Sequence, residues 1–196
     1  MSLVRPGPED PKLGALSADF HGRVVVVGGT GLVGSHLVPV LQEDCIVHSL
    51  SRSQKGVIGS TVIHHSIDLG STWSTDELPA EVDAVVYLAQ SDRFRDLPQD
   101  LVHVFTVNTA SVVSMMNYAL RAGASKFIFA STGGVYPAGL ETFSEQTPIP
   151  VSSTRDFYAA TKLCSEILLE AAAGQIDLTI LRVFFAYGRG QREDML

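Results

Sequence analysis

The sequence of 196 residues has little that would link it to a metal, a membrane or a nucleic acid. Its two cysteines, Cys45 and Cys164, are far apart and have no metal-like spacing, so we expect no metal site and two free thiols in a reducing cytoplasm. No apolar run is long enough to cross a bilayer. A net charge of −7 argues against a nucleic acid or an anionic membrane as partner.

The first 21 residues lack the apolar core of a signal peptide and contain prolines and mixed charges. We expect them to form a flexible N-terminal lead-in. The whole chain is 45% hydrophobic and has only 9 prolines, which is typical of a globular protein. Residues 22–196 are therefore predicted to form one domain.

Short β-branched runs alternate with longer helical stretches from residue 22 onward. Strands are predicted at 23–27, 45–50, 61–67, 83–89, 126–131 and 178–185, and helices at 31–44, 100–123 and 157–174. Strands this apolar, separated by helices, are typical of a parallel sheet covered on both faces. The sequence therefore predicts an α/β fold with a doubly wound parallel sheet. The segment 132–156 is long and irregular, which is unusual for a simple connection.

A glycine-rich turn joins the first strand to the first helix in "VVVVGGTGLVGSHL". It fits G-x-G-x-x-G and G-x-x-G-x-x-G equally well. Such a turn brings backbone N–H groups close to a pyrophosphate at a helix N-terminus, although a glycine-rich turn also occurs in ordinary α/β proteins. Because this turn follows the first predicted strand and opens a helix, we favour a dinucleotide site and hence a Rossmann fold. Its predicted residues are Gly28, Thr30, Gly31, Leu32, Val33 and Gly34.

The choice between NAD and NADP depends on the end of the second strand. An acidic residue there normally holds the ribose 2′-hydroxyl of NAD, but no Asp or Glu lies between Cys45 and Ile67. Ser51 and Arg52 stand there instead, and a guanidinium suits a 2′-phosphate. The sequence thus favours NADP and leaves NAD open, since Arg52 could also be a solvated surface residue. The remaining predicted cofactor residues are Asp68, placed to meet the adenine amino group, Leu69, Ala89, Gln90 and Lys162.

Tyr158 and Lys162 lie one helical turn apart in "FYAATK", and Thr132 follows the fifth predicted strand. A tyrosine with its ordinary pKa of about 10 is a poor base at neutral pH. A neighbouring ammonium and a cationic nicotinamide ring would lower that pKa. We therefore predict that Tyr158 exchanges a proton with the substrate while Thr132 binds the substrate oxygen.

These motifs resemble the extended short-chain dehydrogenase/reductase family, the NAD-dependent epimerase/dehydratase group. The resemblance covers residue 23 to the end and rests on "GGTGLVG", "DAVVYLAQ", "VNTASVVSMMNYA", "FIFASTGGVYP", "YAATK" and "LRVFFAYGRGQ". It implies that Thr132, Tyr158 and Lys162 are the catalytic triad and that Lys162 also holds the nicotinamide ribose. It further implies that Asn108 supports the active site by holding backbone in place. Related enzymes form dimers through this region, so the helix 100–123 could pair with a copy of itself, although its periodicity fits packing within the chain equally well.

The chain also departs from this family. Gly133 and Gly134 replace the Asp-Glu pair of the 4,6-dehydratases, and Phe185 replaces a common Asn that contacts substrate or cofactor. Family members continue for another hundred residues or more, so a C-terminal substrate domain is expected to be missing. We accordingly expect cofactor binding with little turnover, and partly uncovered side chains at Phe184 and Phe185.

The predicted function is NAD(P)-dependent hydride transfer at a secondary alcohol or ketone of a small-molecule substrate. A sugar-like, nucleotide-sugar substrate is the first choice. An NADPH-dependent carbonyl reductase is the alternative, favoured by Arg52 and Phe185. A non-catalytic NADP sensor comes third, because sensors typically lose the Tyr/Lys pair that this chain keeps.

Overall fold

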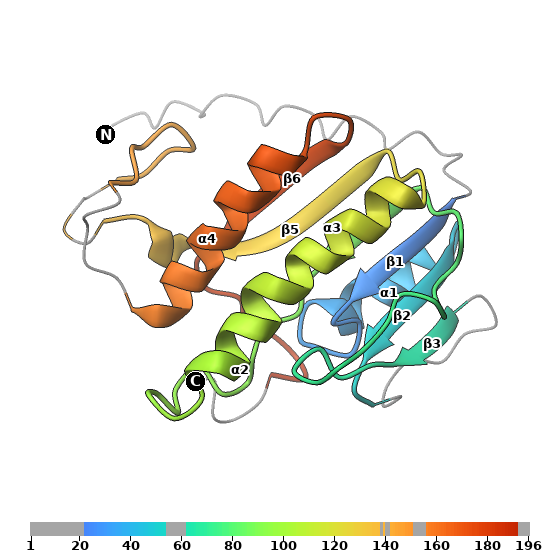
Figure 1. Ribbon diagram of the computed structural model, residues 1–196, viewed down its shortest axis with the longest axis horizontal. Helices are drawn as coiled ribbons and strands as arrows, with labels where there is room; N and C mark the ends of the chain where they lie inside the picture. The colour runs from blue at the N-terminus through green and yellow to red at the C-terminus, as the bar shows by residue number, and fades with distance from the viewer. Residues whose placement is uncertain (1–21, 54–61, 138, 140–141, 151–155, 192–196) are drawn as a thin grey trace, which may run out of the picture.

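The computed structural model describes residues 22–53, 62–137, 139, 142–150 and 156–191. The predicted lead-in, residues 1–21, lies outside the described residues. Within them, six strands form one parallel sheet in the order β3-β2-β1-β4-β5-β6, as Figure 1 shows. The strands are β1 (Arg23–Val27), β2 (Ile46–Ser51), β3 (Val62–Ser66), β4 (Ala84–Tyr87), β5 (Lys126–Thr132) and β6 (Asp177–Val183).

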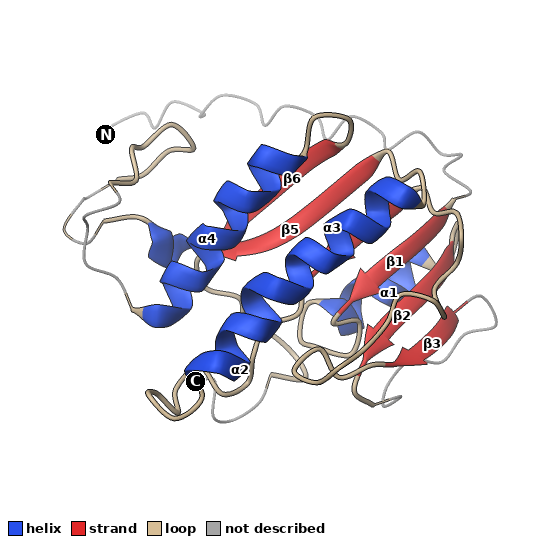
Figure 2. Cartoon of the chain, viewed as in Figure 1, coloured by secondary structure: helices blue, strands red, loops and turns tan. Residues whose placement is uncertain are grey.

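Helices cover both faces of the sheet, which confirms the predicted doubly wound α/β architecture (Figure 2). α2, α3 and α4 lie on one face, and α1 lies on the other. None of the described helices is both long and apolar enough to cross a membrane. The helical segments are α1 (Gly34–Leu41), α2 (Leu101–Phe105), the π-helical turn η1 (Thr106–Ala110), α3 (Ser111–Arg121), the 3-10 turn η2 (Gly133–Val135) and α4 (Phe157–Ala172).

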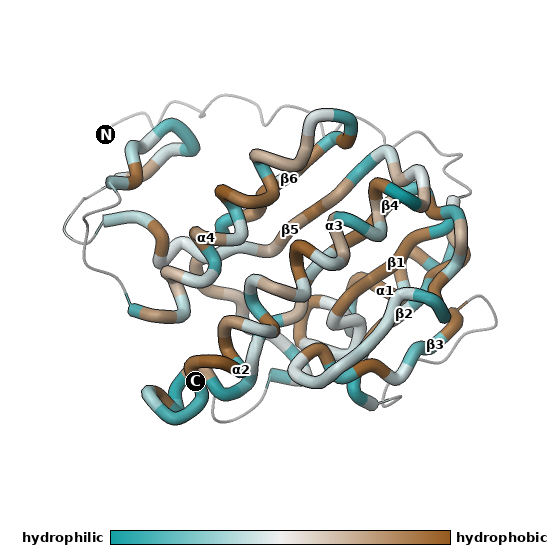
Figure 3. The backbone as a smooth tube through the Cα atoms, in the orientation of Figure 1, coloured by the Kyte–Doolittle hydropathy of each residue, from teal (hydrophilic) through white to brown (hydrophobic). Residues whose placement is uncertain are grey.

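The core consists of two apolar layers, one on each side of the sheet. Alternate residues of β1 enter opposite layers: Val25 and Val27 pack under α3 and α4, whereas Val24 and Val26 pack with Val38 of α1. A strand buried on both faces needs apolar side chains at every position, which explains the continuous valine run. Figure 3 shows this run as hydrophobic backbone along β1.

The strand order reverses its winding direction between β1 and β4. The chain winds from β1 through β2 to β3, and then returns past β1 to build β4, β5 and β6 on the other side. In such sheets, ligands bind beyond the carboxyl ends of the strands where the winding direction reverses. Val27 at the end of β1 pairs with Tyr87 at the end of β4, so the segments that follow these residues share this edge.

The predicted helix 100–123 is one continuous helical segment that is interrupted by the π-helical turn. The carbonyl oxygen of Val107 in this turn accepts hydrogen bonds from the Tyr87 hydroxyl at 2.7 Å and from Ser111 Oγ at 2.7 Å. Tyr87 is fully buried, and burial raises the pKa of its phenol. Tyr87 therefore has a structural role in the core.

The far edge of the sheet is less covered. β6 exposes part of its apolar surface, and Phe184 and Phe185 beyond it are 54% and 93% exposed. The expected lack of cover on these two aromatic side chains is thus confirmed.

Gly34→Ala tests the close packing under the glycine turn. A Cβ at this position would lie 2.7 Å from the Cα of Gly29 and closer still to the carbonyl oxygen of Gly28, and backbone atoms cannot give way cheaply. We expect the free energy of unfolding to fall by about 1–3 kcal/mol in urea titrations. Gly174→Ala is the matched control, since nothing lies within 4 Å of its added methyl group. Equal stability of the two variants would contradict this account.

Candidate active site

The glycine turn is held between the strands on either side of β1. The backbone N–H groups of Gly28 and Gly29 donate to the carbonyl oxygen of Leu50 in β2, at 2.8 and 3.4 Å. On the other side, a Cβ on Gly28 would lie 2.8 Å from the backbone nitrogen of Ala89, just beyond β4. Gly28 also has a φ of 87°, which side chains other than hydrogen disfavour. Only glycine fits this position.

The turn leaves donors available at the start of α1. Among the hydrogen bonds of the described residues, none uses the backbone N–H of Leu32 or Val33. Both groups lie at the N-terminal end of α1, where unpaired N–H groups and the helix dipole favour negative charge. The predicted residues of this turn therefore form a cradle that suits an anionic group such as a pyrophosphate.

Tyr158 extends from the first turn of α4 to the segment after β4. Its hydroxyl donates to Gln90 Oε1 at 2.7 Å, and its ring lies 5.2 Å from that of Phe94. The Asp156 carboxylate fixes the start of the helix by accepting from the Ala159 N–H at 2.7 Å. Burial, followed by the charge of Asp156, raises the pKa of Tyr158 to about 12. The phenol thus lies beside Gln90. Gln90 follows Ala89 in the sequence, and Ala89 lies against Gly28.

Lys162 is fully buried and joins the ends of two strands. Its ammonium donates to the carbonyl oxygen of Ala130 in β5 at 2.9 Å and to that of Ala89 at 3.4 Å. Nζ also lies 4.9 Å from the ring centre of Phe129. Burial lowers the pKa of Lys162 to about 7, and the charge of Glu166 opposes this shift. The carbonyl groups and the ring are the surroundings that favour the charged form of the amine.

Thr132 is the last residue of β5 and lies at the same edge. Its Oγ1 accepts from the Gly134 N–H at 3.1 Å, and an added methyl group on Gly134 would lie 3.6 Å from the Ala159 side chain. Thr132, Tyr158 and Lys162 therefore gather around the start of α4. Within the described residues, no hydrogen bond joins these three side chains directly; Gln90 and backbone carbonyl groups stand between them.

Asn108, in the π-helical turn, ties this edge to α4. Its side chain accepts from the Ser91 N–H at 2.9 Å and donates to Thr161 Oγ1 at 3.1 Å. Thr161 in turn donates to the carbonyl oxygen of Tyr158 at 2.7 Å. The fully buried amide thus fixes the loop after β4 relative to the helix that carries Tyr158.

A buried ion pair lies behind the site and was not predicted from the sequence. Arg182 of β6 binds both oxygens of Glu166, the nearest at 2.8 Å, and donates to the Tyr136 hydroxyl at 2.9 Å. Ser131 donates to the same carboxylate. Two features of the sequence could have indicated this pair. Glu166 is an acidic residue one helical turn after Lys162, and Arg182 is the single cation in a largely apolar strand.

The predicted adenosine end of the site is already hydrogen-bonded. Arg52 forms an ion pair with Asp92 at 2.8 Å, so its guanidinium is not a free surface group. Asp68 accepts from the Gly70 N–H and from Ser71, and these bonds lower the pKa of its carboxyl group. Ser51 donates within its own loop to the Ser53 carbonyl oxygen at 2.8 Å. The side chain of Leu69 is in the core, which leaves only its backbone for a ligand.

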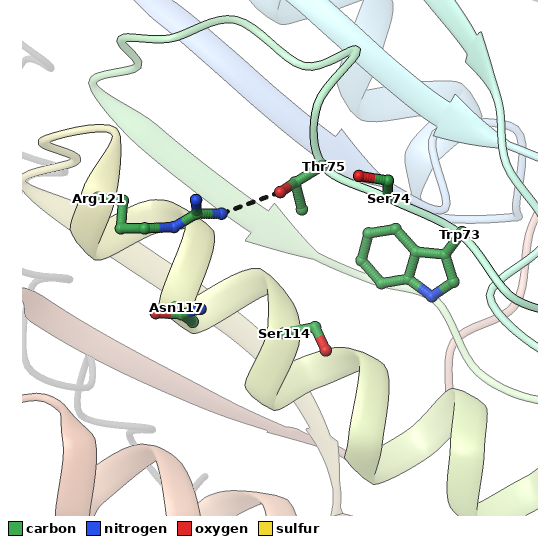
Figure 4. A pocket seen from close by; sticks show the side chains of 6 residues that line it. All are labelled: Trp73, Ser74, Thr75, Ser114, Asn117 and Arg121. Atoms are coloured by element: carbon green, nitrogen blue, oxygen red, sulfur yellow. Dashed lines mark hydrogen bonds between the residues drawn. The ribbon is translucent and has the colours of Figure 1, made fainter.

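Two pockets lie away from this edge. One, of about 260 Å³, lies between α3 and the loop after β3, where Arg121 donates to Thr75 at 3.0 Å (Figure 4). The other, of about 660 Å³, lies at the opposite end of the strands, near Arg23, Ile46 and Asp83. Neither contains a predicted site residue.

Comparison with known proteins decides the family. Residues 24–195 match the model of the NAD dependent epimerase/dehydratase family. The chain belongs to this family. The resemblance inferred from the sequence motifs is therefore confirmed.

Two relatives of this family member are named for nucleotide sugars. A UDP-glucose 4-epimerase of Azospirillum brasilense is 30% identical over 85% of the chain, and a UDP-glucuronic acid decarboxylase 1 of Xenopus tropicalis is 26% identical over 91%. The chain covers 49% and 44% of these two proteins, so it spans about half the length of the curated relatives it matches.

Solved structures confirm the fold. The UDP-glucuronic acid 4-epimerase of Bacillus cereus, in complex with UDP-glucuronic acid and NAD, superposes with a TM-score of 0.76 at 26% identity. MoeE5, in complex with UDP-glucose and NAD, gives 0.73 at 30% identity. The matches cover 88% and 89% of this chain and 60% and 58% of those chains.

Arg182→Met tests the buried ion pair. The substitution leaves the Glu166 carboxylate buried without its cation, and we expect the free energy of unfolding to fall by about 3–5 kcal/mol. Asp177→Asn is the control, because it breaks an exposed pair with Lys126 and should cost about 1 kcal/mol or less. Urea titrations measure both variants. A loss in Arg182→Met as small as that in the control would sink this interpretation.

Lys162→Met tests the depressed pKa of the buried amine. The folded protein releases the Lys162 proton near pH 7, whereas the unfolded chain holds it to about pH 10.5. Between these values the unfolded state binds more protons, so the burial penalty is full below pH 7 and falls as the pH rises.

The stability of Lys162→Met minus that of the wild type should therefore shrink by roughly 1 kcal/mol per pH unit between pH 7 and 9.5. Chemical denaturation at several pH values measures this difference. The exposed Lys126→Met variant should show no such slope, and a flat difference for Lys162→Met would contradict the shifted pKa.

Proposed function

We propose that this chain is the cofactor-binding part of an NAD-dependent enzyme that transfers hydride at a secondary alcohol or ketone of a nucleotide sugar. The observation that carries the proposal is the placement of the Tyr158 phenol. It lies against Gln90, while the adjacent Ala89 contacts both the glycine turn and Lys162. A proton carrier therefore stands at the end of a phosphate cradle, which is the arrangement that hydride transfer requires.

The cofactor would lie along the edge formed by β2, β1 and β4. The residues from Gly28 to Gly34 would hold its pyrophosphate, Ala89 and Gln90 would line its path, and Lys162 would hold the nicotinamide ribose. When bound, the nicotinamide supplies a hydride acceptor or donor. NAD is bound in the related solved structures, which supports NAD for this chain. The preference for NADP that Arg52 suggested stays a prediction, and the ion pair with Asp92 weighs against it.

The proton would move between Tyr158 and the substrate oxygen. With its pKa raised to about 12, the phenol is protonated at neutral pH and is ready to donate. Proton abstraction requires a lower pKa, which a charged Lys162 nearby would provide. Thr132 Oγ1 would bind the substrate oxygen and orient it towards the phenol. The Lys162 amine, with a pKa of about 7, thus changes charge in the range where the enzyme would work.

The names of the relatives support a nucleotide-sugar substrate, and one residue favours a second candidate. Phe185 is 93% exposed and apolar where the family usually has Asn, which would suit an NADPH-dependent carbonyl reductase. A third candidate, a non-catalytic NADP sensor, would need neither Tyr158 nor Lys162. Gly133 and Gly134 offer no acid or base for a 4,6-dehydratase reaction.

A homodimer through the helix 100–123 remains part of the proposal. Apolar side chains are exposed along α2, α3 and α4, namely Val102, Phe105, Val113, Leu120, Ile167 and Leu168. An exposed apolar surface of this kind supports association. The expected location in the cytoplasm stays a prediction.

Tyr158→Phe distinguishes an enzyme from a sensor. The variant keeps the ring that packs on Phe94 but loses the proton, so we expect turnover to fall by about 10²-fold or more while cofactor affinity stays within about threefold. Turnover of UDP-glucose or UDP-glucuronic acid is followed by chromatography of the sugar products, because an epimerase returns the hydride and leaves no net change in NADH absorbance at 340 nm. The assay is run on this chain and on any longer form that contains it. Affinity is measured by calorimetric titration with NADH.

Tyr187→Phe, at a hydroxyl that is 86% exposed, serves as the matched control. Unchanged turnover in Tyr158→Phe would exclude the catalytic role. Failure of the wild-type chain to bind either NADH or NADPH would overturn the proposed function as a whole.

A further inference from the structure

The ion pair between Arg52 and Asp92 joins the segments that follow β2 and β4. Arg52 follows β2, and Asp92 lies in the loop after β4, 40 residues away in the sequence. β2 and β4 are the two neighbours of β1 in the sheet. A contact of 2.8 Å between Arg52 Nη2 and Asp92 Oδ2 therefore joins the two sides of the strand that leads into the glycine turn.

Negative charge prevails around this pair. The charge of Arg52 also acts on the Asp68 carboxylate, so the guanidinium stands between two acids. The second guanidinium nearby, that of Arg93, pairs with Asp100 at 3.0 Å. Among the described residues that these interactions connect, there are two guanidinium groups, three carboxylates and the imidazole of His103. A doubly charged 2′-phosphate would enter a region that already has excess negative charge.

The ion pair is too exposed, and therefore too weak, to prevent the Arg52 guanidinium from binding another anion. The two side chains are 58% and 30% exposed, and ion pairs of this kind are weak. A phosphate could therefore displace Asp92 from the guanidinium, but the carboxylate would remain next to it. Repulsion by Asp92 is the stronger effect, since the two like charges would share one cation.

We propose that Asp92 determines the cofactor specificity of this site and favours NAD over NADP. From the loop after β4, Asp92 supplies the carboxylate that the end of β2 lacks. This inference rests on the proposed function, since it assumes that a dinucleotide binds at the glycine turn. A carboxylate at this edge normally accepts from the ribose 2′-hydroxyl and excludes a 2′-phosphate. Here the acid lies on the opposite side of β1 and is oriented by Arg52.

Calorimetric titrations of the whole chain with NADH and with NADPH test the proposal. They measure cofactor affinity and do not depend on turnover. The variants are Asp92→Asn, Arg52→Gln and the double variant. The matched control is Asp177→Asn, which removes the same charge from an exposed ion pair at the opposite end of the strands. The wild type should bind NADH more tightly. Asp92→Asn should improve NADPH affinity by about tenfold and change NADH affinity by less than about threefold, the size expected for one charge beside a phosphate near the surface.

The gain should require Arg52, so the double variant should lose most of it, and Asp177→Asn should leave the affinity ratio unchanged. A wild type that prefers NADPH, an Asp92→Asn variant with an unaltered ratio, or an equal gain in the control would each overturn the proposal. If neither cofactor binds the wild type, the proposed function fails first. Circular dichroism of each variant shows that the fold is retained.

Discussion

The site depends on one buried amine. Lys162 has no water to solvate its charge, and the carbonyl oxygens of Ala130 and Ala89 take the place of that water. These two carbonyl groups come from the end of β5 and from the residue just beyond β4, so the amine fixes both relative to α4. Thr132 lies two residues after the first carbonyl, and Gln90 lies one residue after the second. The Thr132 hydroxyl and the partner of Tyr158 are therefore both positioned by a single side chain, and the free-energy cost of burying the amine is the cost of holding them there.

The proposed proton chemistry follows from the opposite pKa shifts of two residues one helical turn apart. Burial raises the pKa of Tyr158 to about 12 and lowers that of Lys162 to about 7, because it disfavours the charged form of each group. The phenol is a neutral donor to Gln90 Oε1. A substrate oxygen that replaces Gln90 would receive this donor without any movement of the helix.

The sequence predicted the fold because the central strands β1 and β4 are apolar and buried on both faces, and because apolar runs alternate with helical stretches along the chain. Predicted strands differ from the observed ones by at most a few residues, and α1 starts three residues late because the glycine turn extends to Val33. Spacing was enough to suggest Tyr158 and Lys162 on one helix. It could not reveal pairs whose members meet only through strand order, such as Gln90 with Tyr158, 68 residues apart, or Arg52 with Asp92. Arg52 considered without its partner favoured NADP, because the partner, Asp92, lies in the loop after β4 and is distant in the sequence.

Two of the ion pairs at this end of the sheet, Arg182–Glu166 and Arg52–Asp92, have the same chemistry but different consequences. Glu166 is 2% exposed and its guanidinium partner binds it through two oxygens, so removing either group leaves a charge with no solvent to accept it. Such a pair is a fixed part of the scaffold behind Thr132 and Tyr136. Arg52 and Asp92 face water, and water can replace either partner at little cost. A weak pair can be altered without loss of the fold, whereas loss of the buried pair would disturb the scaffold.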